Sequence, residues 1–115
     1  MLNQPPALDL AFQALADPTR RAMVAHLSLG PASISDLARP LPMSLPAVMQ
    51  HLAVLEKSGL VVSAKVGRVR TCKIDTRALA AAEHWIHAQR SEWERRLDRL
   101  GAYLDGLTGG DANDK

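Results

Sequence analysis

The stretch from Ser33 to Leu60 reads SISDLARPLPMSLPAVMQHLAVLEKSGL and sets the expectations for the rest of the chain. It contains a short apolar segment after Ser33, a turn interrupted by prolines, and a longer apolar segment between Ser44 and Gly59. Serine is a preferred residue before a helix, and glycine commonly follows the end of one. Two short helices joined by a tight turn are typical of a helix-turn-helix, whose second helix enters the DNA major groove. The stretch therefore predicts a DNA-binding unit.

The chain has the size and composition of one globular domain. Its 115 residues can bury one core but not two, and 47% of them are hydrophobic although only 3% are aromatic. We find no apolar run long enough for a membrane span and no signal peptide, and therefore expect a cytoplasmic protein with no membrane partner. Cys72 is the only cysteine, which excludes an intrachain disulfide and an all-cysteine metal site. We interpret it as a half-buried strand residue in preference to a residue with a redox role.

Positive charge is concentrated around the predicted helix-turn-helix. The formal net charge of the chain is only +2, but residues 18–75 contain eight Lys and Arg against three Asp and Glu, a local charge of +5. A protein that binds the phosphate backbone of DNA needs such a basic region. The charge distribution therefore supports double-stranded DNA as the partner.

Two short helices should precede this unit. Leu8 and Phe12 belong to an apolar pattern with helical spacing that predicts a first helix over residues 7–15. Asp17 followed by Pro18 predicts the start of a second helix, which should run to about residue 28.

Arg20 and Arg21 lie in the first turn of that second helix. A cation at this position is unfavourable for the helix dipole unless an anion is close. Two interpretations stay open for both arginines: a contact with a DNA phosphate, or a side chain that is solvated or paired with a carboxylate.

The helix that follows Ser44 should have one buried and one outward face. At 100° per residue, Val48, Leu52 and Leu55 share the buried face. In the first two turns, the side chains on the outward face are short and uncharged, as entry into a major groove requires. A helix face that is only solvated would usually carry more charge. The outward face consists of Pro46, Gln50, Ala53 and Lys57, with Met49 beside them.

Three residues at the start of this helix have distinct candidate roles. Gln50 is the side chain best suited to read a base, because its amide can bind adenine with two hydrogen bonds. Ser44 and the N–H groups of the first turn suit a phosphate. His51 lies at the border of the buried face, so we favour a packed histidine over a base contact.

A β-hairpin should follow, because Gly67 separates two runs rich in Val, Thr and Ile. Val66-Gly67 is a weak turn signal, since a β-branched residue resists a positive φ, and we expect a loop longer than two residues or a bulge. The tip has three cations, Lys65, Arg68 and Arg70. We favour a wing that binds DNA phosphates over a charged edge that only discourages strand pairing.

The last predicted element is a long helix over about residues 76–107. Leu79, Ile86, Trp93, Leu100 and Leu107 recur every seven residues, and Leu97 and Leu104 supply the intermediate positions of the repeat. This stripe is too long to be covered by one body about 30 Å across, the length of a 20-residue helix. We therefore expect the same helix of a second copy as its partner, with the first helix packed alongside. The predicted dimer interface comprises Leu8, Phe12, Ile86, Trp93, Leu97, Leu100 and Leu104.

Together these elements predict a mainly α-helical winged helix-turn-helix with a small β-hairpin, in the order four helices, two strands and one long helix. We expect a single domain over residues 1–115, ordered from about residue 7 to 107. The segments LADPTRRAMVAHL, SISDLARPLPMSLPAVMQHLAVLEKSGLV and AKVGRVRTCKI resemble the ArsR/SmtB family of bacterial winged helix-turn-helix repressors. The resemblance implies a homodimer that binds a palindromic operator and has its first and last helices in the dimer interface. It places Ser44, Leu45, Pro46, Met49, Gln50 and His51 on the recognition helix and Lys65, Arg68 and Arg70 on the wing.

The chain departs from the metal and redox sensors of that family. The stretch 35–39 lacks the Cys-x-Cys pattern, and one cysteine cannot form a redox pair. Glu83 and His87 lie one turn apart and could share a metal only across a dimer axis, while we interpret His84 as solvated. We predict no metal and no cofactor.

Three hypotheses follow for the function. The first is a dimeric DNA-binding transcriptional regulator, a repressor in preference to an activator. The second is a regulator of the same fold that responds to a metal or to another effector of unknown identity. The third is a protein-interaction module that does not bind DNA, against which the +5 region argues. An enzyme is not expected, because the sequence shows no Gly-rich phosphate loop and no nucleophile beside a base.

Overall fold

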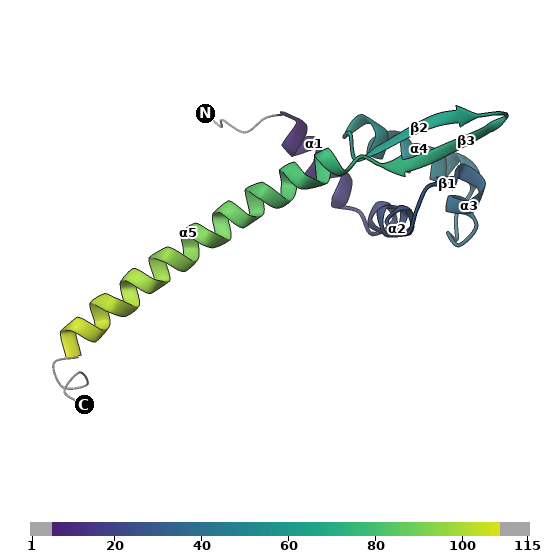
Figure 1. Cartoon of the computed structure of the whole chain (residues 1–115). Coiled ribbons are helices and arrows are strands. Elements are labelled where there is room, and N and C mark those ends of the chain that lie inside the picture. Colours follow the sequence, from purple (N-terminus) through teal and green to yellow (C-terminus); the bar gives the residue numbers. More distant parts are fainter. Residues whose placement is uncertain (1–5, 109–115) are drawn as a thin grey trace. The chain divides into compact units, whose positions relative to one another are not determined.

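The computed structural model describes residues 6–108, and the chain divides into two compact units, Met1–Ala82 and Glu83–Lys115. Since the boundary lies inside one continuous helix, the single domain expected from the sequence stays a prediction. The elements follow the predicted order, with one additional short strand (Figure 1). They are α1 (Pro6–Leu15), α2 (Pro18–Leu27), β1 (Ala32–Ser33), α3 (Ile34–Ala38), α4 (Leu45–Lys57), β2 (Val61–Val66), β3 (Val69–Ile74) and α5 (Thr76–Thr108).

Local capping determines where α2, α3 and α4 begin. Each of Asp17, Ser33 and Ser44 accepts a hydrogen bond from the backbone N–H three residues further on, at 3.0, 3.1 and 3.3 Å respectively. These bonds satisfy donors that have no partner within the helix. At the far end of α4, Gly59 has a φ of +83°, a conformation that favours glycine. The helix starts predicted at these three residues are confirmed.

The core of the first unit is formed by the inward faces of its helices and of the sheet. Val48, Leu52 and Leu55 of α4 are buried, which confirms the predicted inward face. Around them lie buried residues from every other helix and strand that belongs wholly to the first unit, and Ala78 and Leu79 at the start of α5 pack against this cluster. The buried residues around them are Ala11, Ala14, Met23, Leu27, Ala32, Leu37, Leu60, Val61 and Cys72.

The sheet has three antiparallel strands in the order β1-β3-β2. The sequence did not predict β1, because two residues are too few to show strand alternation. Ala32 pairs with Cys72 and Ser33 with Thr71, so β3 is the central strand. This explains why Cys72 is 0% exposed and not half-buried as expected: it is covered on both sides by neighbouring strands and on one face by the core.

The hairpin turn is tighter than predicted. Val66 pairs with Val69, so only Gly67 and Arg68 form the loop, and the expected longer or bulged loop is wrong. Val66 avoids the positive φ by remaining in the strand, while Gly67 adopts a φ of +66°. Positive φ is confined to glycines in the described part of the chain, so Arg68 has a negative φ. A positive φ at the first loop residue alone is the pattern of a type II′ turn.

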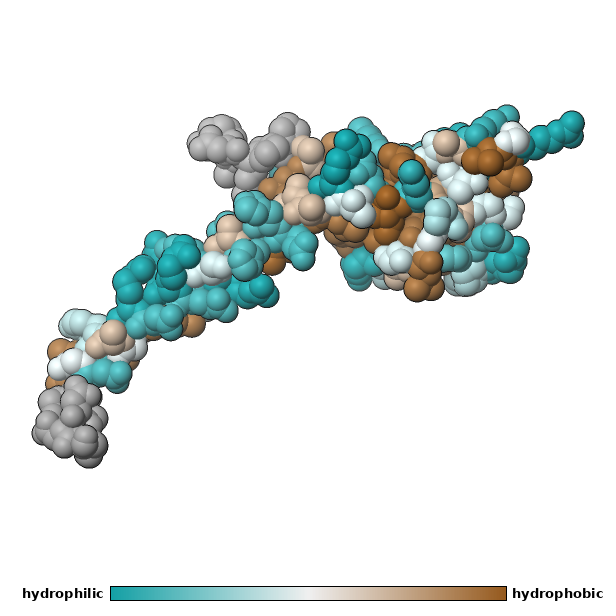
Figure 2. Space-filling model, in the orientation of Figure 1, coloured by the Kyte–Doolittle hydropathy of each residue, from teal (hydrophilic) through white to brown (hydrophobic). Residues whose placement is uncertain are grey.

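Helix α5 begins after Asp75, as predicted. The Asp75 carboxylate accepts the backbone N–H of Arg77 at 3.0 Å and pairs with its guanidinium at 2.8 Å, which holds the pKa of Asp75 at about 2. Within the second unit the helix is largely hydrophilic, with hydrophobic patches along it (Figure 2). Over residues 6–108, no helix combines the length and the apolar character that a membrane span requires.

Candidate nucleic-acid interface

The N-terminal half of α4 presents the surface that the sequence predicted. Ser44, Leu45, Pro46, Met49 and Gln50 are exposed. Their neighbours Val48 and Leu52 are buried in the core and hold the helix in this rotation about its axis. The exposed side chains are uncharged, so this end of α4 can approach a duplex without electrostatic repulsion.

The register of the hairpin separates its side chains into two faces. Val66 and Val69 are opposite each other on the outer face, which is exposed. Lys65 and Arg70 are opposite each other on the inner face, the one that also includes the buried residues Val61 and Cys72. Hydrophilic side chains extend from the tip of the hairpin in Figure 2. All three predicted wing cations are exposed, but Arg70 also contacts Glu56 at the end of α4. Lys65 and Arg68 lie next to or in the turn at the tip.

Arg70 is bound to two residues for which the sequence pattern predicted no role. Its Nε donates to Ser63 Oγ at 3.0 Å, and its Nη2 lies 3.3 Å from Glu56 Oε2. The Ser63 hydroxyl in turn donates to the same oxygen of Glu56. Strand alternation could have placed Ser63 and Arg70 on one face, but the approach of Glu56 depends on how α4 packs against the hairpin.

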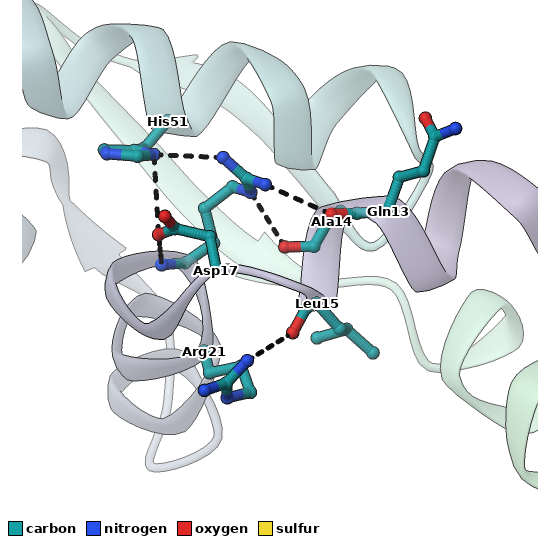
Figure 3. A network of polar contacts seen from close by, with 7 residues as sticks. Gln13, Ala14, Leu15, Asp17, Arg21 and His51 are labelled. Carbon is teal, nitrogen blue, oxygen red and sulfur yellow. Dashed lines mark hydrogen bonds and ion pairs between the residues drawn. The ribbon is translucent and has the colours of Figure 1, made fainter.

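His51 belongs to a polar network beneath α4 (Figure 3). Its Nδ1 lies 3.2 Å from Arg20 Nη1 and 3.8 Å from Asp17 Oδ2, and its side chain is only 24% exposed. Asp17 also accepts the backbone N–H of Arg20, the main cause of the lowered pKa of its carboxyl group. These contacts support the interpretation of His51 as a packed residue.

Arg20 and Arg21 bind backbone carbonyls at the end of α1. Arg20 donates from Nε to Ala14 O at 2.8 Å and from Nη2 to Gln13 O at 3.1 Å, and Arg21 Nη1 donates to Leu15 O at 2.7 Å. The last carbonyls of a helix have no partner within it, and a cation near that end is favourable for the helix dipole. The geometry favours a structural role for Arg20, a possibility that neither sequence interpretation included.

Cys72 should be unreactive in the folded protein. Burial raises the pKa of its thiol, and the nearby Glu56 carboxylate raises it further. Because the thiolate is the nucleophile, we expect iodoacetamide at pH 8 to modify Cys72 slowly in the native protein and completely in concentrated urea. Mass spectrometry measures this directly, since the chain has no second cysteine. Equal rates of modification with and without urea would contradict the burial of the Cys72 thiol in the native protein.

The residues predicted for the dimer interface differ in exposure. Leu8 is only 7% exposed within its own chain, and Phe12 is half-buried. The residues of α5 are exposed, and they recur at heptad spacing: Ile86, Trp93, Leu97, Leu100 and Leu104. This exposure leaves the stripe of α5 available to another chain.

The candidate metal ligands lie on the exposed surface of α5. Glu83, His84 and His87 are exposed, and His87 lies near Arg90 and Ser91 at 3.5 and 3.4 Å. Within residues 6–108, His, Cys, Asp and Glu side chains do not come together in groups of three that could hold a metal.

Known proteins match the chain over this interface and beyond it. A family model described as a helix-turn-helix domain matches residues 15–64. The HTH-type transcriptional regulator Rv2034 of Mycobacterium tuberculosis is 51% identical over 73 residues, which are 64% of this chain and 68% of that protein. The structure of RHA00566, an ArsR family transcriptional regulator, is 49% identical with a TM-score of 0.74 and spans 82% of this chain and 97% of its own.

A more distant structure shows the same fold. The homodimeric winged helix-turn-helix domain Mb0332 of Mycobacterium bovis is 19% identical, with a TM-score of 0.58 over 86% of this chain and 95% of that one.

Proposed function

Because the chain belongs to the ArsR family of transcriptional regulators, we propose that it acts as a homodimeric repressor that binds a palindromic operator. The observation that supports the mode of binding most directly is the exposed, uncharged N-terminal surface of α4. Such a surface can enter a major groove, and the exposed cations of the hairpin can reach the backbone beside it.

The residues divide into base readers and backbone contacts. Gln50 reads a base edge, and Leu45, Pro46 and Met49 make apolar contacts in the groove. Phosphates are bound by Ser44, Lys57, Lys65 and Arg68, all of which are exposed. In this scheme His51 and Arg20 support α4 from below and do not touch DNA.

Dimerisation supplies the second recognition helix. A single α4 contacts only part of one helical turn, whereas two copies related by a two-fold axis can read half-sites about 34 Å apart. The exposed heptad stripe of α5 is the surface through which the two copies pair.

Gln50→Ala tests the proposed reading of bases. We expect the preference for the duplex upstream of the protein's own gene over a scrambled duplex to fall about 5- to 150-fold for each of the two half-sites, since each half-site loses one two-bonded base contact. Fluorescence anisotropy on both labelled duplexes measures this ratio. The control is Gln89→Ala, the same change on the exposed surface of α5. Wild-type protein that shows no binding at low salt, or that binds both duplexes equally, would contradict the proposal.

A further inference from the structure

We propose that Glu56 and Ser63 are positioning residues for the wing, which bind Arg70 against the end of α4 and withhold it from the DNA phosphates. This inference rests on the proposed function, because it assigns roles inside the DNA-binding surface. It separates Arg70 from Lys65 and Arg68, with which the sequence pattern had grouped it.

The contacts of Arg70 use Nε and Nη2, the two nitrogens along one edge of its guanidinium group. Nε donates to Ser63 Oγ and Nη2 to Glu56 Oε2, while the Ser63 hydroxyl donates to that same carboxylate oxygen. The three residues come from the last turn of α4, the middle of β2 and the first half of β3. The network therefore connects the recognition helix to both strands of the wing.

The pairing of the strands gives a reason for a carboxylate at this place. Lys65 and Arg70 are directly opposite each other on the inner face of the hairpin. Like charges in directly opposed positions destabilise a strand pair. Glu56 offsets one of the two charges, so the wing can have a cation on its inner face without the full cost of the repulsion. The Arg70 side chain is about half exposed and forms an ion pair with Glu56. Among the described residues, Lys65 forms no ion pair with a carboxylate.

Engagement with a carboxylate changes what Arg70 contributes to DNA binding. A cation steepens the salt dependence of binding only when it neutralises a phosphate and releases a counterion. While Glu56 neutralises Arg70, that residue contributes rigidity of the wing and no counterion release. Arg68 is exposed in the turn itself and should neutralise a phosphate, which releases a counterion.

The test measures the slope of log K against log[KCl] by fluorescence anisotropy on the promoter duplex. Arg68→Gln should make the slope shallower by about 0.9 for each phosphate that the variant no longer neutralises. Arg70→Gln should weaken binding severalfold without changing the slope. Glu56→Gln should make the slope steeper, by up to about 0.9 for each protomer, because the released Arg70 gains a phosphate.

Two further variants separate positioning from a general charge effect. In the double variant Glu56→Gln/Arg70→Gln the slope should return to the wild-type value. If loss of the carboxylate charge alone steepened the slope, the double variant would keep the steeper value, and this would overturn the proposal. Ser63→Ala breaks the bond to Nε but leaves the ion pair between Glu56 and Arg70, so it should steepen the slope less than Glu56→Gln does.

Failure of this proposal is distinct from failure of DNA binding. A shallower slope for Arg70→Gln, equal to that of Arg68→Gln, would show that Arg70 contacts phosphate and would overturn the positioning role. By contrast, an unchanged slope for Arg68→Gln, or a wild-type protein that does not bind the duplex, would contradict the proposed DNA interface itself. Circular dichroism on each variant checks that the wing variants are folded.

Discussion

Replacing Leu97 and Leu100 together by glutamate is expected to convert the proposed homodimer into a monomer that binds its operator on the order of 100-fold more weakly. The two side chains are 45% and 52% exposed within one chain, so the substitutions cost the isolated helix little. In a paired helix they would place four carboxylates in an apolar seam. The loss of affinity follows because the second half-site then binds independently of the first.

The matched control places the same charges on the other face of the same helix. Ala88 and Ala102 are exposed and lie opposite the Leu97 and Leu100 stripe at 100° per residue. Ala88→Glu/Ala102→Glu should therefore remain dimeric. Sedimentation velocity reports the mass of each variant, and anisotropy reports its affinity for the promoter duplex. A wild-type protein that is monomeric while bound to DNA would refute the dimer model.

Leu55→Ala is expected to lower the free energy of unfolding by about 2–5 kcal/mol. Leu55 is 0% exposed and lies on the inward face of α4, where its removal leaves a cavity between this helix and its neighbours. Urea unfolding followed by circular dichroism measures the change. Protein concentration must be the same in both samples, because dimerisation contributes to apparent stability.

The adjacent residue provides the control for Leu55. Val54 is 39% exposed on the same helix, and Val54→Ala should change the free energy of unfolding by less than about 1 kcal/mol. Equal effects of the two substitutions would mean that α4 does not have the rotation described above. The outward position of Gln50 would then be lost as well, since both follow from the same helix orientation.

The contacts of Arg20 illustrate why one interpretation from sequence was incomplete. A cation in the first turn of α2 is unfavourable for the dipole of that helix. The structure resolves the conflict through the preceding helix, because α1 ends beside the start of α2 and its last carbonyls accept the guanidinium N–H groups. The sequence identifies both helices, but the angle between them is a tertiary property.

The amino-acid sequence by itself determined the helices, the buried face of α4, the existence of the hairpin and the heptad stripe of α5. These features depend on interactions between residues close in the chain, such as the caps at Asp17, Ser33 and Ser44, and on periodicity that one element displays alone. The outward surface that includes Gln50 was predictable for the same reason, because it is the complement of the buried face.

Only the tertiary structure decided the partners of β1, Arg20 and Arg70. Strand β1 exists because Ala32 meets Cys72, forty residues away, and two residues have no detectable pattern of their own. Arg70 pairs with Glu56 because α4 packs against the hairpin at one particular register. A charged side chain is satisfied by whichever counter-charge the fold brings near, so its role follows from packing and not from its neighbours in sequence.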